Sequence, residues 1–315
     1  MDAVSRLLAH SRAELSKAVV GQRELVDQCL VTILAGGHAL IEGVPGIAKT
    51  LVVKVFALLL RIHFQRVQCT SDLMPADLLG TNILNMASGT FTLHRGPLFT
   101  DLLLVDEVNR MPPRTQAALL EAMEERQVTI DGKRYPLNEL FTVFATQNPI
   151  EFEGTYPLPE AQLDRFLLKI KATYPDAAGE VAILEKHHNG FEPHNLDELG
   201  LRPVEPEVLT QARQELKKIR VEPALFEYLT KIVRRSRDWP SLSLGASPRA
   251  ALSLMAAAKA YAAMEGRDFL IPDDVKQAAL PVLRHRIILK PEADLEGIDA
   301  DRVIGDVLAA VEVPK

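Results

Sequence analysis

The stretch GVPGIAKT, residues 43–50, constrains the fold of this 315-residue chain more than any other. Just before it, residues 38–41 form a short apolar run between glycines, which indicates a buried strand. Residues 50–61 then form an unbroken run of helix-compatible side chains. A strand, a glycine-containing loop and a helix in this order are the context that a phosphate-binding loop requires.

The residue types in this loop suit phosphate binding, because backbone N–H groups at the positive end of a helix bind phosphate oxygens. We expect Lys49 to reach the β- and γ-phosphates of a nucleotide and Thr50 to ligate Mg²⁺. Ala48 replaces the second glycine of the usual pattern, and its methyl group is tolerable if its φ is negative and helical. The alternative is a glycine turn that only caps a helix. The predicted nucleotide-binding residues of the loop are Gly43, Val44, Pro45, Gly46, Ile47, Ala48, Lys49, Thr50 and Leu51.

Two more apolar runs end in polar residues. Residues 102–105 precede Asp106 and Glu107, and such a continuous run indicates a strand buried on both faces of a parallel sheet. We expect Asp106 to hold Mg²⁺ and Glu107 to polarise the attacking water as general base. The run 141–146 precedes Asn148, whose amide is expected to orient that water. The alternatives are a solvated acidic strand end and a plain Asn-Pro turn.

Two arginines have weaker signals of their own. Arg249 follows Ser247 and Pro248, which are typical of a helix N-cap and first helical position. A cation in the first turn opposes the helix dipole, so Arg249 fits this position if an anion lies nearby. The alternative is an exposed arginine that is tolerated at a small cost. Arg165 taken alone indicates a surface ion pair.

Five strings together, GVPGIAKT, LLLVDEVNR, ATQNP, EGTYPLPEAQLDRF and GASPRA, resemble the MoxR-type AAA+ ATPases of the helix-2-insert group, which are related to magnesium chelatase subunits. In that family the position of Ala48 is commonly alanine. The resemblance implies ATP and Mg²⁺ as cofactors. It assigns Asp106 and Glu107 to Walker B, Asn148 to sensor 1, Arg165 to the arginine finger, Arg249 to sensor 2, and Gly21 and Gln22 to the border of the adenine.

The expected fold is α/β. Strands alternate with helices from residue 19 to about residue 175, which predicts a three-layer parallel sheet. With the resemblance, this implies an AAA+ P-loop domain at 1–190. Helical periodicity then predicts a small all-α lid at 191–315 that brings Arg249 over the nucleotide. Arg284, His285 and Arg286 are expected on a solvated helix face of this lid.

Two hairpins are predicted inside the first domain. Residues 81–84 and 89–93 pair through a polar turn, and residues 127–130 and 133–135 pair through Asp131-Gly132, a strong hairpin signal. The resemblance implies that such hairpins contact the remodelled partner. The alternative is that they only brace the sheet.

The composition narrows the range of partners and of locations. A net charge of −6 argues against broad nucleic-acid or anionic-membrane binding. Cys29 and Cys69 have no disulfide or metal-ligand spacing. Without a signal peptide or an apolar run near 18 residues, the sequence predicts a cytoplasmic protein with no membrane segment.

The leading functional hypothesis is an ATPase that remodels or matures a protein partner in a chaperone-like role, metal-cofactor insertion included. An arginine finger acts on ATP held by a neighbour, so the resemblance implies a homo-oligomeric ring, expected to be a hexamer, and often a von Willebrand factor A domain partner. The alternative is a nucleic-acid-stimulated motor or loader, suggested by Lys133 and Arg134 beside the second hairpin. A module that senses ATP without hydrolysing it is disfavoured, because Glu107 and Arg165 are both present.

Overall fold

The centre of the molecule is a five-stranded sheet in the order β2-β5-β8-β1-β9, with every neighbouring pair parallel. The computed structural model describes residues 2–86, 89–149, 154–193 and 195–314. The strands expected before the phosphate loop, before Asp106 and before Asn148 are confirmed, whereas β2 and β9 were not predicted. Their bounds are β1 (Ala39–Glu42), β2 (Phe64–Gln68), β5 (Leu102–Asp106), β8 (Thr142–Gln147) and β9 (Leu168–Lys171).

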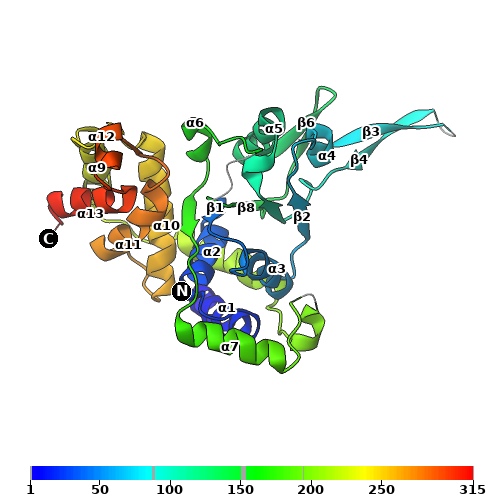
Figure 1. Ribbon diagram of the computed structural model, residues 1–315, viewed down its shortest axis with the longest axis horizontal. Helices are drawn as coiled ribbons and strands as arrows, with labels where there is room; N and C mark the ends of the chain where they lie inside the picture. The colour runs from blue at the N-terminus through cyan, green and yellow to red at the C-terminus, as the bar shows by residue number, and fades with distance from the viewer. Residues whose placement is uncertain (1, 87–88, 150–153, 194, 315) are drawn as a thin grey trace.

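Helices cover both faces of this sheet, which confirms the three layers (Figure 1). Alternate residues of one strand enter different cores, because successive side chains point to opposite faces. Leu102 and Leu104 of β5 pack in the core with α1, α2 and α3, whereas Leu103 and Val105 pack in the core with α5. These helices span α1 (Asp2–Ala18), α2 (Arg23–Ala35), α3 (Lys49–Leu60) and α5 (Pro113–Glu125).

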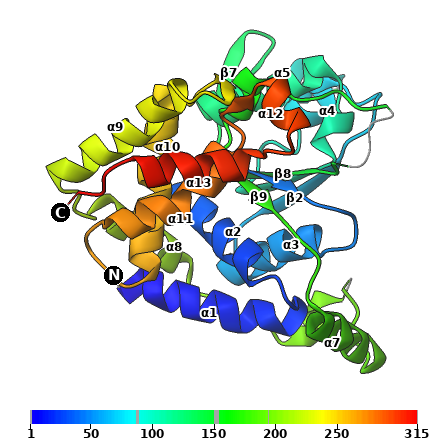
Figure 2. The same cartoon turned by 60° about the vertical axis from the view of Figure 1, so that its left-hand side comes forward.

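The C-terminal part is a helical lid, as predicted, with one addition (Figure 2). Two short strands, β10 (Leu242–Leu244) and β11 (Ile288–Leu289), pair antiparallel where helix was expected throughout. Strands of two and three residues are too short to show a period of two in a sequence. Helix α7 (Ala177–His188) comes before the lid. The helices that follow it are α8 (Pro206–Lys217), α9 (Pro223–Arg237), α10 (Pro248–Met264), α11 (Pro272–Leu283), α12 (Pro291–Leu295) and α13 (Ala300–Ala310).

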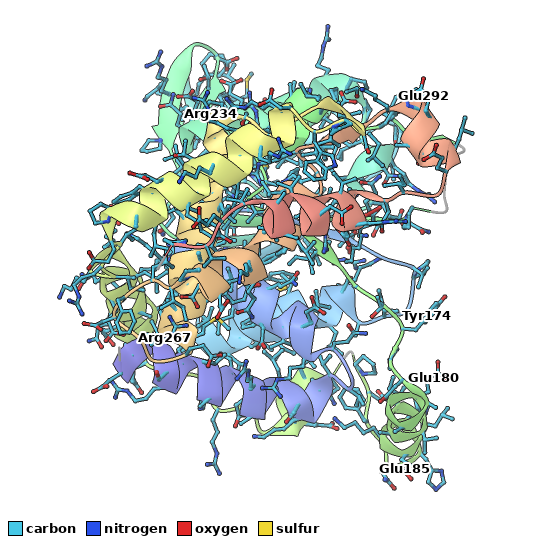
Figure 3. All side chains as sticks on the ribbon, turned by 90° about the vertical axis from the view of Figure 1, so that its left-hand side faces the viewer. Tyr174, Glu180, Glu185, Arg234, Arg267 and Glu292 are labelled. Atoms are coloured by element: carbon cyan, nitrogen blue, oxygen red, sulfur yellow. The ribbon has the colours of Figure 1, made fainter. Side chains whose placement is uncertain are left out.

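The lid and the sheet domain share one continuous core. Helix α8 packs on α1 and α2, and α10 packs on α2. The Val204 N–H donates to the Leu59 carbonyl at 2.7 Å, so the chain after residue 190 first returns to the sheet domain. The predicted division at residue 190 stays a prediction. Figure 3 shows Tyr174 on the segment that leads to α7 and Glu180 on α7 itself, far from Arg234 on α9 and Glu292 on α12.

The expectation of a solvated face at residues 284–286 is wrong. His285 and Arg286 are each only 6% exposed. Arg286 Nε donates to Asp164 Oδ1 at 2.7 Å, and the same guanidinium donates to the Asp164, Phe166 and Leu167 carbonyls. A buried guanidinium is stable here because its donors are satisfied and its charge is paired. Arg286 therefore ties the lid to the segment that carries Arg165.

Both predicted hairpins are present, and the first projects from the body of the molecule (Figure 1). The expected turn at Ala87 and Ser88 lies outside the described residues. Asp131 and Gly132 both have positive φ, 50° and 76°, as a two-residue hairpin turn requires. The hairpins are β3 (Gly80–Asn85) with β4 (Thr90–Arg95), and β6 (Gln127–Ile130) with β7 (Lys133–Pro136); the short helices are α4 (Pro75–Leu79) and α6 (Glu160–Leu163). Within the described residues, no helix combines the length and apolar character needed to cross a bilayer.

Candidate active site

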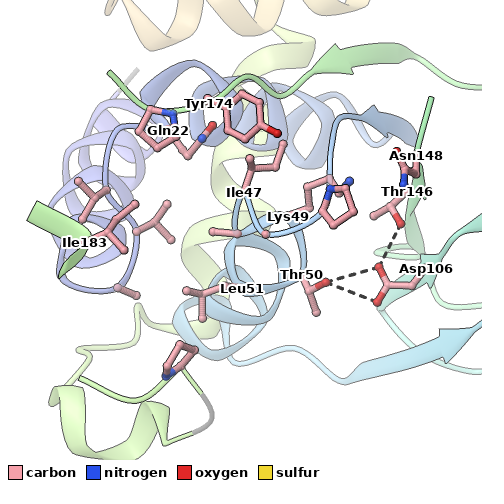
Figure 4. A pocket seen from close by; sticks show the side chains of 18 of the residues that line it. Gln22, Ile47, Lys49, Thr50, Leu51, Asp106, Thr146, Asn148, Tyr174 and Ile183 are labelled. Atoms are coloured by element: carbon pink, nitrogen blue, oxygen red, sulfur yellow. Dashed lines mark hydrogen bonds between the residues drawn. The ribbon is translucent and has the colours of Figure 1, made fainter. Parts of the chain in front are cut away.

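A cavity of about 600 Å³ opens at the edge of the sheet where the strands end (Figure 4). The phosphate loop, the ends of β2, β5 and β8, the segment that joins α1 to α2, and α7 with the residues around it form its walls. Parallel strands end at one edge, so side chains far apart in sequence meet there. The predicted residues that line it are Gln22, Pro45, Gly46, Ile47, Ala48, Lys49, Thr50, Leu51, Asp106, Glu107 and Asn148.

The backbone of the loop corrects one expectation. Ala48 has φ 63° and ψ 19°, in the left-handed region, where a negative helical φ was expected. Helix α3 begins at Lys49, one residue later than that expectation assumed, so Ala48 occupies the N-cap position. A residue with a Cβ loses roughly 1–2 kcal/mol in this conformation, which explains why the usual pattern has glycine there. The loop holds Ala48 in a strained backbone at a functional position.

Lys49 lies over the loop itself. Its Nζ donates a hydrogen bond to the carbonyl oxygen of Gly43 and another, at 3.2 Å, to that of Val44. Gly43 is needed for space, since a Cβ there would lie 2.6 Å from the Ala172 carbonyl oxygen. The ammonium group thus sits within the loop whose N–H groups are expected to bind phosphate.

Asp106 is the centre of a hydrogen-bonded cluster, and it is only 6% exposed. Thr50 Oγ1 lies 3.4 and 3.5 Å from its two carboxylate oxygens, and Thr146 Oγ1 donates to Oδ1 at 3.1 Å (Figure 4). Arg66 Nε donates to Oδ2 at 2.6 Å. A hydroxyl and a carboxylate that converge in this way fit Mg²⁺, which prefers oxygen ligands and takes few of them from the protein.

Glu107 follows in a strained conformation, with φ 58°. Its backbone N–H donates to Thr146 Oγ1 at 2.9 Å, which links it to the Asp106 cluster. Its carboxylate accepts from Gln68 Nε2 at 3.1 Å and lies 3.1 Å from Arg110 Nε. Left-handed backbone at a non-glycine residue is typical of functional sites, where the surroundings hold it in place.

Three residues of this cluster escaped the sequence analysis: Arg66, Gln68 and Thr146. Arg66 and Gln68 alternate along β2, and Gln68 is in register with Asp106 on β5. The signal that could have found them is a polar residue at every second position in a strand beside β5. Thr146 belongs to the string ATQNP, but the sequence predicts only that it is part of a strand.

Of the three predicted residues that remain, Asn148 and Gln22 line the cavity, whereas Gly21 is not among its lining residues. Asn148 directly follows β8, is 6% exposed and lines the cavity. Gln22 also lines it, and its Nε2 donates to the Thr173 carbonyl at 2.8 Å. Gly21 has φ 70°, and a Cβ there would lie 3.0 Å from Pro175 Cβ. Gly21 is therefore needed where residues 20–22 pass the start of α7.

The two arginines lie elsewhere. Arg249 Nη2 is 2.5 Å from Glu124 Oε1, and Arg165 Nε is 3.6 Å from Glu124 Oε2. Arg165 Nη1 also donates to the Leu120 carbonyl at 2.7 Å. Both line a second cavity at α5, and neither is among the residues that line the first. We call Arg165, Arg249 and Glu124 the arginine cluster.

The expectation that the lid brings Arg249 over the nucleotide of its own chain is therefore wrong for this structure. Helix α10 starts beside the end of α5, and Glu124 is the anion near its first turn. Ser247 stands at the N-cap position, but its hydroxyl donates to Asp164 Oδ2 at 3.0 Å instead of capping the helix.

A phosphate loop at the carboxyl edge of a five-stranded parallel sheet, with acidic and amide residues on neighbouring strands and a helical lid, defines an AAA+ ATPase. The chain matches the model of the "ATPase family associated with various cellular activities (AAA)" over residues 38–168 and that of the AAA lid domain over residues 234–307.

Comparison with whole proteins narrows this class. The chain is 41% identical to Chaperone MoxR1 of Mycobacterium tuberculosis over 96% of its length and 81% of that protein. It is 32% identical to Protein MoxR of Methylorubrum extorquens over 96% of its length and 93% of that protein. The crystal structure of a proposed ATPase from Cytophaga hutchinsonii superposes with a TM-score of 0.90 and 40% identity, covering 99% of this chain and 96% of that one. The chain belongs to the MoxR family of AAA+ ATPases.

Proposed function

We propose that this ATPase hydrolyses ATP with Mg²⁺ as cofactor in a cytoplasmic ring of identical subunits, and that the ring remodels or matures a protein partner. The observation that carries the proposal is the separation of the cavity from the arginine cluster. The name of the relative Chaperone MoxR1 supports the remodelling role. Metal-cofactor insertion is one form that such maturation takes.

The residues of the cavity have separate roles in binding and hydrolysing ATP. The N–H groups of residues 46–50 and the Lys49 ammonium bind the phosphate tail. Thr50 and Asp106 would hold Mg²⁺, which neutralises charge on the phosphate oxygens. Glu107 accepts the proton of the attacking water, a role worth on the order of 10²- to 10⁴-fold in rate, and Asn148 orients that water.

The arginine cluster supplies a further cation, in addition to Lys49 and Arg66 of the cavity. Charge that develops on the transferring phosphoryl group needs a cation nearby, and an arginine supplied by a neighbour contributes on the order of 10³- to 10⁵-fold. Arg165 and Arg249 both lie outside the cavity of their own chain, so they act on the nucleotide of the next subunit. A contact between two different faces repeats from subunit to subunit, and a closed ring, here a hexamer, satisfies every face.

The projecting hairpin β3–β4 is the proposed contact with the partner, for which a von Willebrand factor A domain protein is one candidate. Ile83, Met86 and Phe91 are 52%, 86% and 71% exposed on it. Large apolar side chains at this exposure favour a protein-binding role over a purely bracing one.

Two complementary variants test the shared site. Lys49→Ala lacks nucleotide binding but keeps its arginines, and Arg165→Ala keeps its cavity but lacks the finger. Each alone should be nearly inactive. An equal mixture should recover about a quarter of parent activity, because half of the cavities are intact and half of those face an intact Arg165. The matched control mixes Arg165→Ala with Lys49→Ala/Arg165→Ala and should stay inactive. A mixture no more active than its components would show that the arginine serves its own chain.

The alternative of a nucleic-acid motor has one supporting feature. Lys133 and Arg134 are exposed on the second hairpin. Against it stands the net charge of −6. We expect neither single-stranded nor duplex DNA or RNA to raise ATP turnover. A severalfold, salt-dependent stimulation that is lost in Lys133→Gln/Arg134→Gln would favour the motor.

A further inference from the structure

Another cavity, of about 610 Å³ and distinct from the one at the arginine cluster, lies at the opposite edge of the sheet, where the strands begin. The carboxyl end of α2, the loop before β8, and the helices α8 and α10 surround it; these three helices lie side by side (Figure 2). None of its lining residues belongs to the first cavity. We call it the α8–α10 cavity.

Two guanidinium groups from distant parts of the chain meet in this cavity. Arg126 follows α5 and Arg213 lies on α8, and each donates to the Glu139 carbonyl oxygen at 3.1 Å. Arg213 also donates twice to the Ile33 carbonyl at 3.0 and 2.7 Å, and Arg126 donates to the Gly36 carbonyl. Carbonyls at the negative end of α2 thus fix both groups in place.

Carbonyl oxygens orient these cations but do not neutralise them. In the described part of the chain, neither arginine has a carboxylate within 4.0 Å. Burial and the neighbouring charge of Arg126 lower the pKa of Arg213 to about 10, while the charge of the Glu139 carboxylate acts in the opposite direction. Two like charges held this close in a partly buried site are costly unless an anion joins them.

The surroundings increase the positive charge. Lys217 of α8 and Lys259 of α10 also line the cavity, whereas Glu139 is the one acidic residue among the described residues that line it. Capping of α2 explains the two arginines but not the two lysines. The rest of the wall is apolar and includes Leu34, Leu140, Leu216 and Met255.

We propose that the α8–α10 cavity binds a phosphorylated metabolite of about nucleotide size. The bonds to carbonyl oxygens use part of the five N–H donors of each guanidinium, and the other N–H groups remain for phosphate oxygens. The two ammonium groups add charge from the facing helices. The apolar wall receives the rest of the ligand. The volume matches that of the first cavity, about 610 against about 600 Å³.

Calorimetric titration with inorganic pyrophosphate tests the part of this site that binds the phosphate groups. The titration uses Lys49→Ala, so that the phosphate loop does not contribute. We expect one binding site, weakened about tenfold or more when Lys217→Gln and Lys259→Gln are added. The control adds Lys218→Gln and Lys290→Gln to Lys49→Ala, which removes the same charge from exposed lysines outside the cavity. This control should bind pyrophosphate with the same affinity as Lys49→Ala. Absence of binding, or equal affinity in both double variants, would overturn the proposal.

A second measurement locates the ligand on the full chain. Methionines labelled in the methyl group give a signal for Met255, which a Met255→Leu variant assigns. Pyrophosphate should shift this signal in Lys49→Ala and in the Lys218/Lys290 control, but not in the Lys217/Lys259 variant. If heat is released while the Met255 signal stays unchanged in Lys49→Ala, the anion binds elsewhere and the proposal fails.

Discussion

The first cavity and the arginine cluster are built in different ways. In the cavity, residues from the ends of β2, β5 and β8 and from the phosphate loop converge, and hydrogen bonds join Asp106 to Thr50, Arg66 and Thr146. In the arginine cluster, two cations share one carboxylate at the end of α5, with Arg249 46% exposed. The fold therefore gathers the cavity residues within one chain and leaves the arginine cluster outside that cavity.

The largest expected effect comes from the arginine cluster. Arg165→Ala should lower kcat by about 10³-fold or more, because the phosphoryl group loses its cation. ATP affinity should change by less than about twofold, because Arg165 does not line the cavity of its own chain. Turnover of the assembled protein and a titration with labelled nucleotide measure the two quantities. Arg234→Ala, which removes an exposed arginine on α9, is the control. A large loss of ATP affinity with unchanged kcat in Arg165→Ala would contradict the difference between the cavity and the arginine cluster.

Glu107→Gln addresses the cavity and should lower kcat by about 10²- to 10⁴-fold. Nucleotide binding should persist, because glutamine keeps an oxygen that accepts from Gln68, as Glu107 does at 3.1 Å. Single-turnover hydrolysis and nucleotide affinity check the two halves of this expectation. Hydrolysis at the parent rate would show that another group takes the proton.

His38 is a buried histidine just before β1, between β8 and α5. It precedes β1, its Nε2 bonds the Met123 carbonyl of α5 at 3.1 Å, and its Nδ1 accepts from the Val143 N–H at 2.9 Å. Burial lowers the pKa of His38 to about 3. Below pH 6.5 the unfolded chain takes up a proton that the folded chain does not. The free energy of unfolding therefore decreases as the pH decreases, by at most about 1.4 kcal/mol per pH unit.

His38→Gln should remove that contribution to the pH slope between about pH 6 and pH 4. Denaturant unfolding at several pH values measures it, with the exposed His94→Gln as control. Part of the slope should remain, because burial also lowers the pKa of His285. An unchanged slope in His38→Gln would mean that His38 is protonated in the folded chain.

The smallest expected effect is a gain. Ala48→Gly should stabilise the folded protein by up to about 1 kcal/mol, because relief of the left-handed strain exceeds the extra entropy of glycine in the unfolded chain. Thermal unfolding without nucleotide checks this. Ala57→Gly, inside α3, should instead destabilise by about 1 kcal/mol or more. A loss of stability in Ala48→Gly would contradict the strain.

The sequence predicts the parallel-sheet fold and much of the cavity for one physical reason. Lys49, Asp106 and Asn148 each follow a buried strand, and parallel strands end at the same edge. Local pattern and topology together are enough to bring them near one another. Arg66 was missed because β2 mixes polar and apolar residues, with only Val67 buried, and does not read as a buried strand.

The location of Arg249 could not be predicted, because it depends on packing between distant segments. The lid is oriented by contacts such as the buried pair of Arg286 with Asp164. Nothing near Arg286 in the sequence shows that the Asp164 carboxylate and the carbonyl oxygens of residues 164, 166 and 167 will surround it. The left-handed φ of Ala48 was missed for a different reason, since it depends on where α3 begins to within one residue.

The outward position of the arginine cluster has an arithmetical consequence for the proposed assembly. An open row of subunits always has one cavity that faces no arginine and one arginine cluster that faces no cavity. A closed ring has neither, so ring closure completes one further site without any change in a subunit. Turnover per subunit should therefore rise slowly as rows lengthen and reach its full value when the two ends join.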